Sequence, residues 1–74
     1  MLLSAPEALA IRDALLALNN VGGKLDVSLS GKRVREDSEG RVEVYECVPA
    51  GENRYGATEF YIDQDDFLAA YNIR

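Results

Sequence analysis

Hydrophobic residues in the first twenty positions recur at the spacing of an α-helix. Apolar residues at a spacing of three or four form one stripe along this helix, which consists of Ala8, Ile11, Leu15 and Leu18. Leu9 and Leu16 lie beside the stripe and widen it. Ser4 is placed to cap this segment, with Glu7 three residues later completing a capping box, and two consecutive glycines follow the segment. The pattern therefore predicts a helix over residues 5–19.

From Leu25 onward the hydrophobic period changes to two, which is typical of β-strands. Four such segments follow one another, joined by short turns that contain glycine or acidic residues. The strands are expected in LDVSLS (25–30), KRVRE (32–36), RVEVYECV (41–48) and RYGATEFYI (54–62), with turns at 30–31, 37–40 and 49–53. Consecutive strands with such short connections form an antiparallel meander.

The last segment, TEFYIDQDD (58–66), changes from a strand pattern to a helix start. We expect Asp63 to cap a helix over DQDDFLAAY (63–71), with Asp65 and Asp66 stabilised in its first turn by the helix dipole. A calcium loop is the alternative reading. It needs a mid-loop glycine and a closing glutamate, which this segment lacks. The expected fold is α+β in the order α-β-β-β-β-α, one compact domain over residues 1–74 with both helices on one face of the sheet.

Alternation assigns the strand residues to two faces of this sheet. In the third strand, Val42, Val44 and Val48 are expected in the core, and Glu43, Tyr45 and Cys47 on the open face. In the fourth strand, the core face is expected to carry Phe60 and Ile62 with Gly56 and Thr58, and the open face Tyr55, Ala57, Glu59 and Tyr61.

Glu46 does not fit this alternation, because it falls among the core valines. Three explanations are open: a bulge resets the register, the residue lies at the sheet edge, or the acid is buried. The tyrosines also have two readings. They fill strands for cross-strand packing alone, or they form a partner-binding face, because tyrosine is enriched at interfaces.

The charge is distributed unevenly. The chain has a net charge of −5, and residues 36–74 hold ten acidic residues against three arginines. A net negative charge repels nucleic acids and anionic membranes, and favours a basic protein partner. No run of about 18 apolar residues and no basic leader segment is present, so we expect a cytoplasmic protein that binds neither membrane nor nucleic acid directly.

The residue types exclude several kinds of chemistry. The chain has no histidine and one cysteine, Cys47, so it lacks the usual general base, a histidine-activated nucleophile and the ligands of a structural zinc site. Gly22-Gly23-Lys24 lacks the spacing of a phosphate-binding loop. We therefore expect a non-enzymatic protein with no cofactor and no metal.

The chain resembles the small inhibitors that phages encode against bacterial defence, of which the anti-CRISPR proteins are the familiar case. The features that carry the resemblance are the short length, the capped helix SAPEALAIRDALLAL, the meander and the acidic end EFYIDQDDFLAAYNIR. The resemblance extends over the whole chain but lies in these general features, without a diagnostic motif, so it assigns no functional residue. It implies a protein that binds a CRISPR effector subunit in the host bacterial cytoplasm, and some members of this class imitate DNA with rows of carboxylates.

A basic DNA-binding channel is complementary to an acidic surface. The candidate partner-binding residues are the carboxylates and tyrosines of the second half of the chain: Glu36, Asp37, Glu39, Glu43, Tyr45, Glu52, Tyr55, Glu59, Tyr61, Asp63, Asp65 and Asp66. The alternative is a structural or assembly protein of phage or bacterial origin that associates with itself through the open sheet face. Of the two oligomeric states, a monomer is favoured over a dimer.

Overall fold

The sheet is a four-stranded antiparallel meander. The computed structural model describes residues 1–47 and 55–73, with side chains from Thr58 onward in the second segment. The elements are α1 (Ala5–Asn19), β1 (Asp26–Leu29), β2 (Lys32–Glu36), β3 (Val42–Cys47), β4 (Tyr55–Tyr61) and α2 (Gln64–Ala70), and the strand order in the sheet is β1-β2-β3-β4. The α-β-β-β-β-α order and the α+β fold predicted from the sequence are confirmed.

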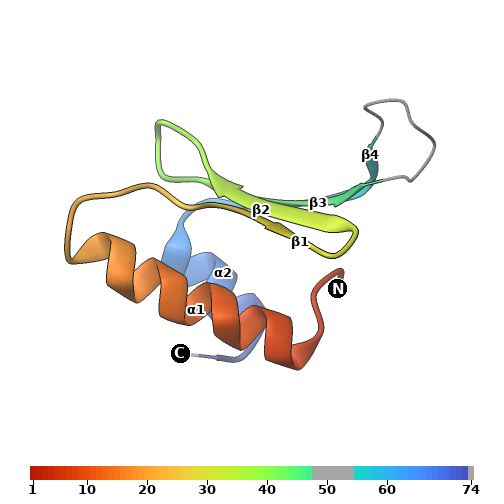
Figure 1. Ribbon diagram of the computed structural model, residues 1–74, viewed down its shortest axis with the longest axis horizontal. Helices are drawn as coiled ribbons and strands as arrows, with labels where there is room; N and C mark the ends of the chain where they lie inside the picture. Colours follow the sequence, from red (N-terminus) through yellow and green to blue (C-terminus); the bar gives the residue numbers. More distant parts are fainter. Residues whose placement is uncertain (48–54, 74) are drawn as a thin grey trace.

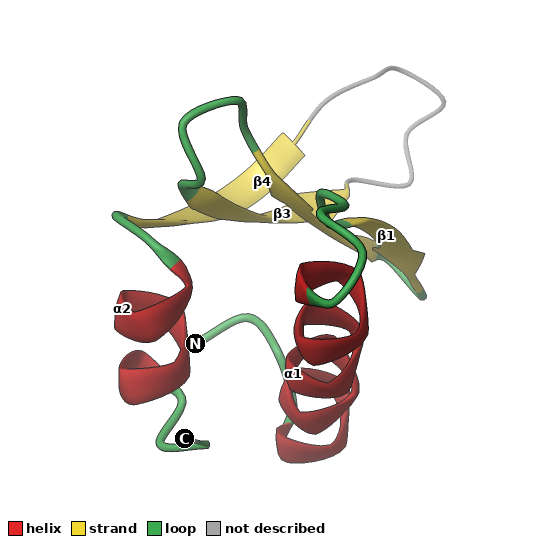
Figure 2. Cartoon of the chain, turned by 90° about the vertical axis from the view of Figure 1, so that its left-hand side faces the viewer, coloured by secondary structure: helices red, strands yellow, loops and turns green. Residues whose placement is uncertain are grey.

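The protein has two layers. Both helices lie on the same face of the sheet, and none of the described residues forms a helix on the other face (Figure 1). Seen from the end where the β2–β3 turn lies, α1 and α2 are side by side below the sheet (Figure 2). The predicted placement of both helices on one face is confirmed.

The caps predicted for α1 are present. The Ser4 hydroxyl accepts a hydrogen bond from the Glu7 amide, and the Glu7 carboxylate accepts one from the Ser4 amide. Leu9 and Leu16, expected to widen the apolar stripe, are instead 39% and 57% exposed. The prediction for these two leucines is wrong, because α1 packs against a single layer and buries only the narrow stripe that faces the sheet.

The core lies between the sheet and the helices. Val34, Val42 and Val44 of the two central strands are fully buried, as is Phe67 of α2. The α1 side chains that complete the core are Ala8, Ile11 and Leu15, and Leu3 and Leu25 join them. Complete burial of a large apolar side chain stabilises a fold by about 1.5–3 kcal/mol, so these few residues supply most of the hydrophobic stabilisation of this small protein.

From Thr58 to Tyr61, the faces of β4 are the reverse of those predicted. Tyr61 pairs with Val42 and Glu59 with Val44, so both residues face the helices. Phe60 pairs with Glu43 on the open face, where it is 70% exposed, and Ile62 is 77% exposed. The predictions that Phe60 and Ile62 belong to the core, and that Glu59 and Tyr61 lie on the open face, are wrong. Thr58, also expected in the core, pairs with Tyr45 and is exposed.

The reason is a network of aromatic and polar contacts below β4. The Tyr61 ring contacts Phe67 edge-on, with ring centroids 5.5 Å apart, and lies 6.1 Å from the ring of Tyr71. The Glu59 carboxylate accepts hydrogen bonds from the hydroxyls of Tyr61 and Tyr71 and from the amide of Leu2. A tyrosine buries its ring while its hydroxyl stays bonded. This space therefore accepts Tyr61 and Glu59, and leaves Phe60 and Ile62 outside.

A register irregularity at the end of β3 resolves the position of Glu46. The pairing of β3 with β4 shifts between Tyr45 and Cys47, so the ladder is irregular at Glu46, although Glu46 is not moved to the open face. Glu46 pairs with Lys32 on the helix side of the sheet but is exposed, so it is not a buried acid. Val48 and the expected 49–53 turn lie outside the described residues.

Acid should weaken the link between α1 and β2. Lys32 donates a 2.6 Å hydrogen bond to Glu7, which lowers the pKa of Glu7 from 4.5 to about 2, and the Ser4 amide contributes to the shift. Because the folded-state pKa is depressed, the stabilisation is complete above about pH 4.5 and is lost as the pH falls towards 2. Chemical unfolding between pH 7 and pH 2 should therefore show a smaller loss for Glu7→Gln than for the unmodified chain. Parallel pH profiles for the two proteins would contradict the role of Glu7.

Removing the charge of Glu59 should destabilise the fold. In Glu59→Gln an amide NH2 group, which donates hydrogen bonds, replaces one acceptor oxygen. The Leu2 amide or a tyrosine hydroxyl therefore loses its acceptor, at a cost of about 1–3 kcal/mol. Urea unfolding followed by circular dichroism measures the change. Glu46→Gln is the matched control, since Glu46 also lies on the helix side of the sheet but is exposed, and it should change stability by less than about 0.5 kcal/mol.

Candidate functional site

Acidic side chains gather at one end of the molecule. There the β2–β3 turn lies beside the start of α2, because β2 and β4 run in the same direction and finish at the same end of the sheet (Figure 2). We call this region the acidic end; its carboxylates are Glu36, Asp37, Glu39, Asp63, Asp65 and Asp66. The structure thus brings together half of the twelve candidate residues, from segments 24 or more positions apart in sequence. The cations placed among them are Lys24 and Arg41.

Glu36 lies at the base of this end and is 8% exposed. Its carboxylate accepts hydrogen bonds from the Leu25 amide, at 2.9 Å, and from the side-chain amide of Gln64, at 2.8 Å. The sequence predicted that Glu36 ends the strand at 32–36, which is confirmed, and named it as a candidate for partner binding, although its side chain is almost fully buried. Glu36 belongs to β2 and points to the helix side, so its carboxylate connects the sheet to α2.

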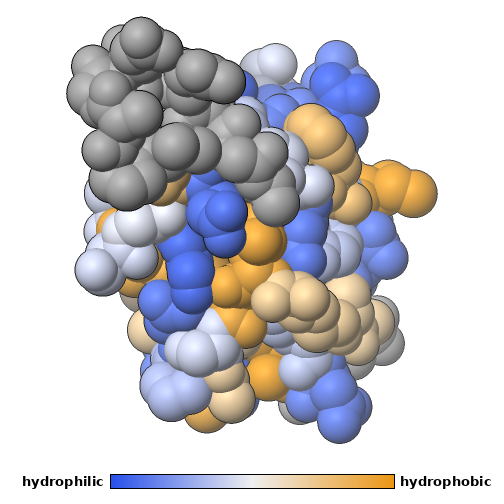
Figure 3. Space-filling view, turned by 90° about the vertical axis from the view of Figure 1, so that its right-hand side faces the viewer, coloured by the Kyte–Doolittle hydropathy of each residue, from blue (hydrophilic) through white to orange (hydrophobic). Residues whose placement is uncertain are grey.

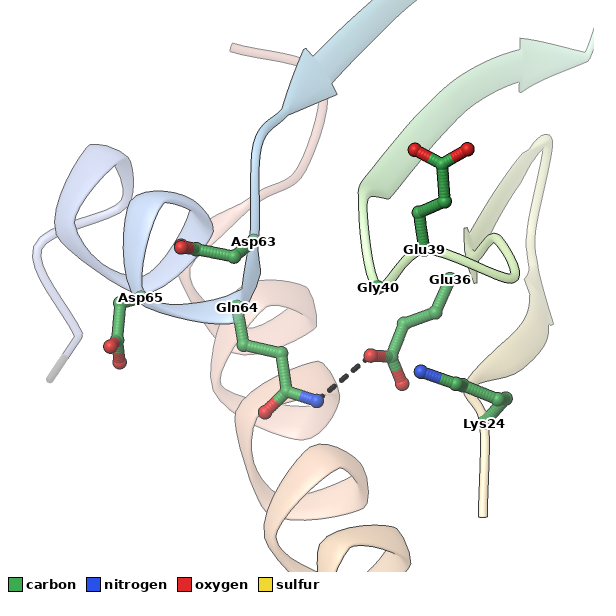
Figure 4. A pocket seen from close by; sticks show the side chains of 7 residues that line it. All are labelled: Lys24, Glu36, Glu39, Gly40, Asp63, Gln64 and Asp65. Carbon is green, nitrogen blue, oxygen red and sulfur yellow. Dashed lines mark hydrogen bonds between the residues drawn. The ribbon is translucent and has the colours of Figure 1, made fainter. Parts of the chain in front are cut away.

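An open polar groove lies above Glu36, with a volume of about 310 Å³. Its walls are formed by the β2–β3 turn and the start of α2, and Lys24 points towards the Glu36 carboxylate (Figure 4). The carboxylates of Asp63 and Asp65 point away from Glu36 and do not converge on one point (Figure 4). In the described part of the chain, no group of three or more cysteine or acidic side chains is arranged to hold a metal ion.

Asp37 is occupied by its own turn. Its carboxylate accepts hydrogen bonds from the amides of Glu39 and Arg41 and from the Arg41 guanidinium. The bond from the Arg41 side chain is the largest of the effects that lower the pKa of Asp37. Gly40 closes the turn with a φ of 84°, a conformation that glycine adopts without strain. Glu39 projects outward with its side chain 69% exposed and lies 3.5 Å from Arg41.

Asp63 caps α2, as predicted. Its carboxylate accepts a hydrogen bond from the amide of Asp66, and the Asp66 carboxylate accepts one from the amide of Ile62. Asp65 lies in the same first turn, and all three aspartates are exposed. A capping carboxylate keeps one oxygen turned towards solvent, so these residues serve the helix and still contribute negative charge to the surface.

The open face of the sheet is balanced in charge. Glu43 accepts hydrogen bonds from Arg35, at 2.9 Å, and from the Tyr45 hydroxyl, and the bond to Glu43 is the main reason that the pKa of Tyr45 is raised. Asp26 forms a bidentate pair with Arg33, which lowers the pKa of Asp26. Glu43 and Tyr45 lie on the open face as predicted, but Glu43 is neutralised there by a neighbouring strand.

The remaining candidates are separated from the acidic end. Glu59 and Tyr61 lie on the helix side, in the network below β4. Glu52 lies outside the described residues, and of Tyr55 only the backbone is described, which pairs with Cys47. The twelve residues therefore do not form one surface.

Sequence reasoning missed the exposed apolar pair Phe60 and Ile62. Alternation shows that they share a face but does not tell which face, because Tyr61 is also able to fill a core. The contacts that decide the face are the hydrogen bonds that Glu59 accepts from Leu2 and Tyr71, and the sequence alone gives no signal for them.

The opposite end of the molecule differs from the acidic end. Hydrophobic side chains are visible there between hydrophilic ones (Figure 3). Lys32 lies there beside two acids. It donates a hydrogen bond to Glu7, and it pairs with Glu46 in the register of β2 and β3. Neither helix in the described part of the chain combines the length and hydrophobicity of a membrane span.

Comparison with known proteins found no matching family model, no matching curated protein and no matching solved structure. The functional argument therefore rests on the residues and their geometry.

Replacing Glu36 should cost more stability than replacing its neighbour in the groove. In Glu36→Gln, an amide NH2 group replaces one carboxylate oxygen and faces either the Leu25 amide or the Gln64 side chain, which are both donors. We expect the free energy of unfolding to fall by about 1–3 kcal/mol. Glu39→Gln is the matched control in the same groove and should change stability by less than about 0.5 kcal/mol. Denaturant unfolding measures both variants, and equal stabilities would refute the structural role of Glu36.

Proposed function

We propose that this protein is a non-enzymatic, protein-binding inhibitor that docks on a basic protein surface through its acidic end. The observation that carries the proposal is a groove lined by four carboxylates, those of Glu36, Glu39, Asp63 and Asp65, with Lys24 as the cation of its lining. Asp37 and Asp66 lie beside this groove in the same turn and the same helix start, and Asp37 is paired with Arg41. Arg41 is itself tied to Asp37 and Glu39, so it offers little to an anionic partner.

The geometry favours the acidic end over the open sheet face as the electrostatic surface. On the open face, Asp26 and Glu43 are each paired with an arginine of β2. At the acidic end, Asp63, Asp65 and Asp66 keep exposed positions, and Glu39, whose side chain is 69% exposed, shares Arg41 with Asp37. Surface charges with high exposure contribute mainly to the association rate and to partner selection, and their contribution decreases with salt.

The partner class is the one implied by the resemblance to anti-CRISPR proteins: a CRISPR effector subunit with a basic nucleic-acid channel. A cluster of carboxylates enters such a channel in place of phosphates, because the lysines and arginines that neutralise DNA also neutralise carboxylates. The proposed location is the bacterial cytoplasm, where such effectors act.

The test is competition with target DNA on purified CRISPR effector complexes, measured by gel shift across several effector types. Added protein should reduce the bound DNA for one type, and Glu39→Lys and Asp65→Lys should each weaken this inhibition. The expected loss is on the order of ten-fold in apparent affinity at low salt, about 1.4 kcal/mol, and smaller at high salt.

Asp13→Lys is the matched control, since Asp13 is an exposed acid of α1 outside the acidic end and its side chain is 68% exposed. It should inhibit like the unmodified chain. Undisturbed DNA binding by every effector would refute the partner class. Equal weakening by all three reversals would refute the acidic end as the contact surface.

A further inference from the structure

The strand β4 is an edge of the sheet and differs from the opposite edge. β4 has seven residues and β1 has four. Long edge strands expose unpaired amide and carbonyl groups, and proteins commonly protect such edges by short length, charged side chains or proline. β1 fits that description, because it is short and carries Asp26, which is bonded to Arg33.

The described part of β4 has no such protection on its open side. Thr58 and Phe60 point to the open face and carry no charge, and Ile62 follows directly after the strand. Phe60 is 70% exposed and Ile62 is 77% exposed. The one charged side chain of β4 whose position is described, Glu59, points to the helix side, where Leu2 and Tyr71 bind it.

We propose that β4 is a self-association site, at which two copies of this chain pair antiparallel along their β4 edges and form one continuous eight-stranded sheet. The pairing is two-fold symmetric, so each copy offers the same strand and receives the same strand. The backbone amides and carbonyls of the two β4 strands supply the hydrogen bonds between the copies. On the open face, Phe60 of each copy is partly buried against the strand of the other.

The distribution of charge favours a second copy as the occupant. The described part of β4 carries no charged side chain on the open face, so a strongly charged partner strand finds no complementary group there. A second β4 is uncharged on the same face, so the two strands pair without leaving a charge unmatched. Each chain has a net charge of −5, which opposes association unless the acids stay apart. The acidic end lies at the C-terminal end of β4, and antiparallel pairing places the two acidic ends at opposite ends of the dimer.

The length of the pairing is set by Asp66. Its carboxylate accepts a hydrogen bond from the Ile62 amide, 3.0 Å away, so this amide is already bonded within the chain. The new ladder therefore falls within Tyr55–Tyr61. One pair of strands buries less surface than the roughly 1,200 Å² of the smallest standard interfaces, so we expect a weak, concentration-dependent dimer.

This inference is independent of the proposed inhibition, because it uses a different surface. Sedimentation velocity from micromolar to millimolar protein should show a monomer–dimer equilibrium. Phe60→Lys should raise the dissociation constant at least ten-fold, because it places a charge on the paired edge. Leu16→Lys is the matched control: Leu16 is an exposed apolar residue of α1, 57% exposed, and its replacement should leave the equilibrium unchanged.

Backbone amide chemical shifts locate the contact. Raising the protein concentration should shift the amides of residues 55–61 most, while those of β1 stay unchanged. A monomer throughout the range, or a dimer that Phe60→Lys leaves intact, would overturn the proposal. Shifts centred on Arg33 and Tyr45 would also overturn it, because they would indicate that the open faces stack on each other rather than that the edges pair.

Discussion

The position of α2 depends on the buried carboxylate of Glu36. α2 is seven residues long and buries one large side chain, Phe67, so its own hydrophobic contacts are few. Glu36 holds its first residue through Gln64, which also exchanges hydrogen bonds with Asn19 at the end of α1. The same carboxylate bonds the Leu25 amide at the start of β1. One charged group therefore joins the sheet to α2, and through Gln64 the end of α1.

This arrangement gives the acids of the protein two different tasks. Glu36, Asp37 and Glu59 are acceptors for amides and hydroxyls of the chain itself, and the fold needs them as acceptors. Glu39 and Asp65 are exposed at the acidic end, with Glu39 3.5 Å from Arg41, and the proposed function assigns their charge to partner binding. A count of acidic residues in the sequence does not separate these tasks, because the separation depends on which backbone amides come close to which carboxylates.

The local features of the fold were predictable from the sequence because they depend on neighbours in the chain. The Ser4–Glu7 box, the positive φ of Gly40 and the cap at Asp63 are each decided within a few residues. The faces of β4 were not predictable in this way. Alternation fixes which residues share a face, but the choice of face depended on Glu59, whose partners lie as far away as Leu2, 57 positions earlier. The candidate residues do not form one surface for the same reason, because Glu36 and Glu59 accept hydrogen bonds from residues that are distant in the sequence.

The two edges of the sheet differ in length and in charge, and this difference limits how the protein assembles. A sheet with two open edges adds copies at both sides and grows into a fibre. Here β1 is short and carries an ion pair, so an antiparallel pair formed through β4 uses the long edge of both copies and leaves only protected edges outside. If two copies pair as proposed, growth ends at two copies, and Phe60 is covered in a closed assembly rather than left exposed to aggregation.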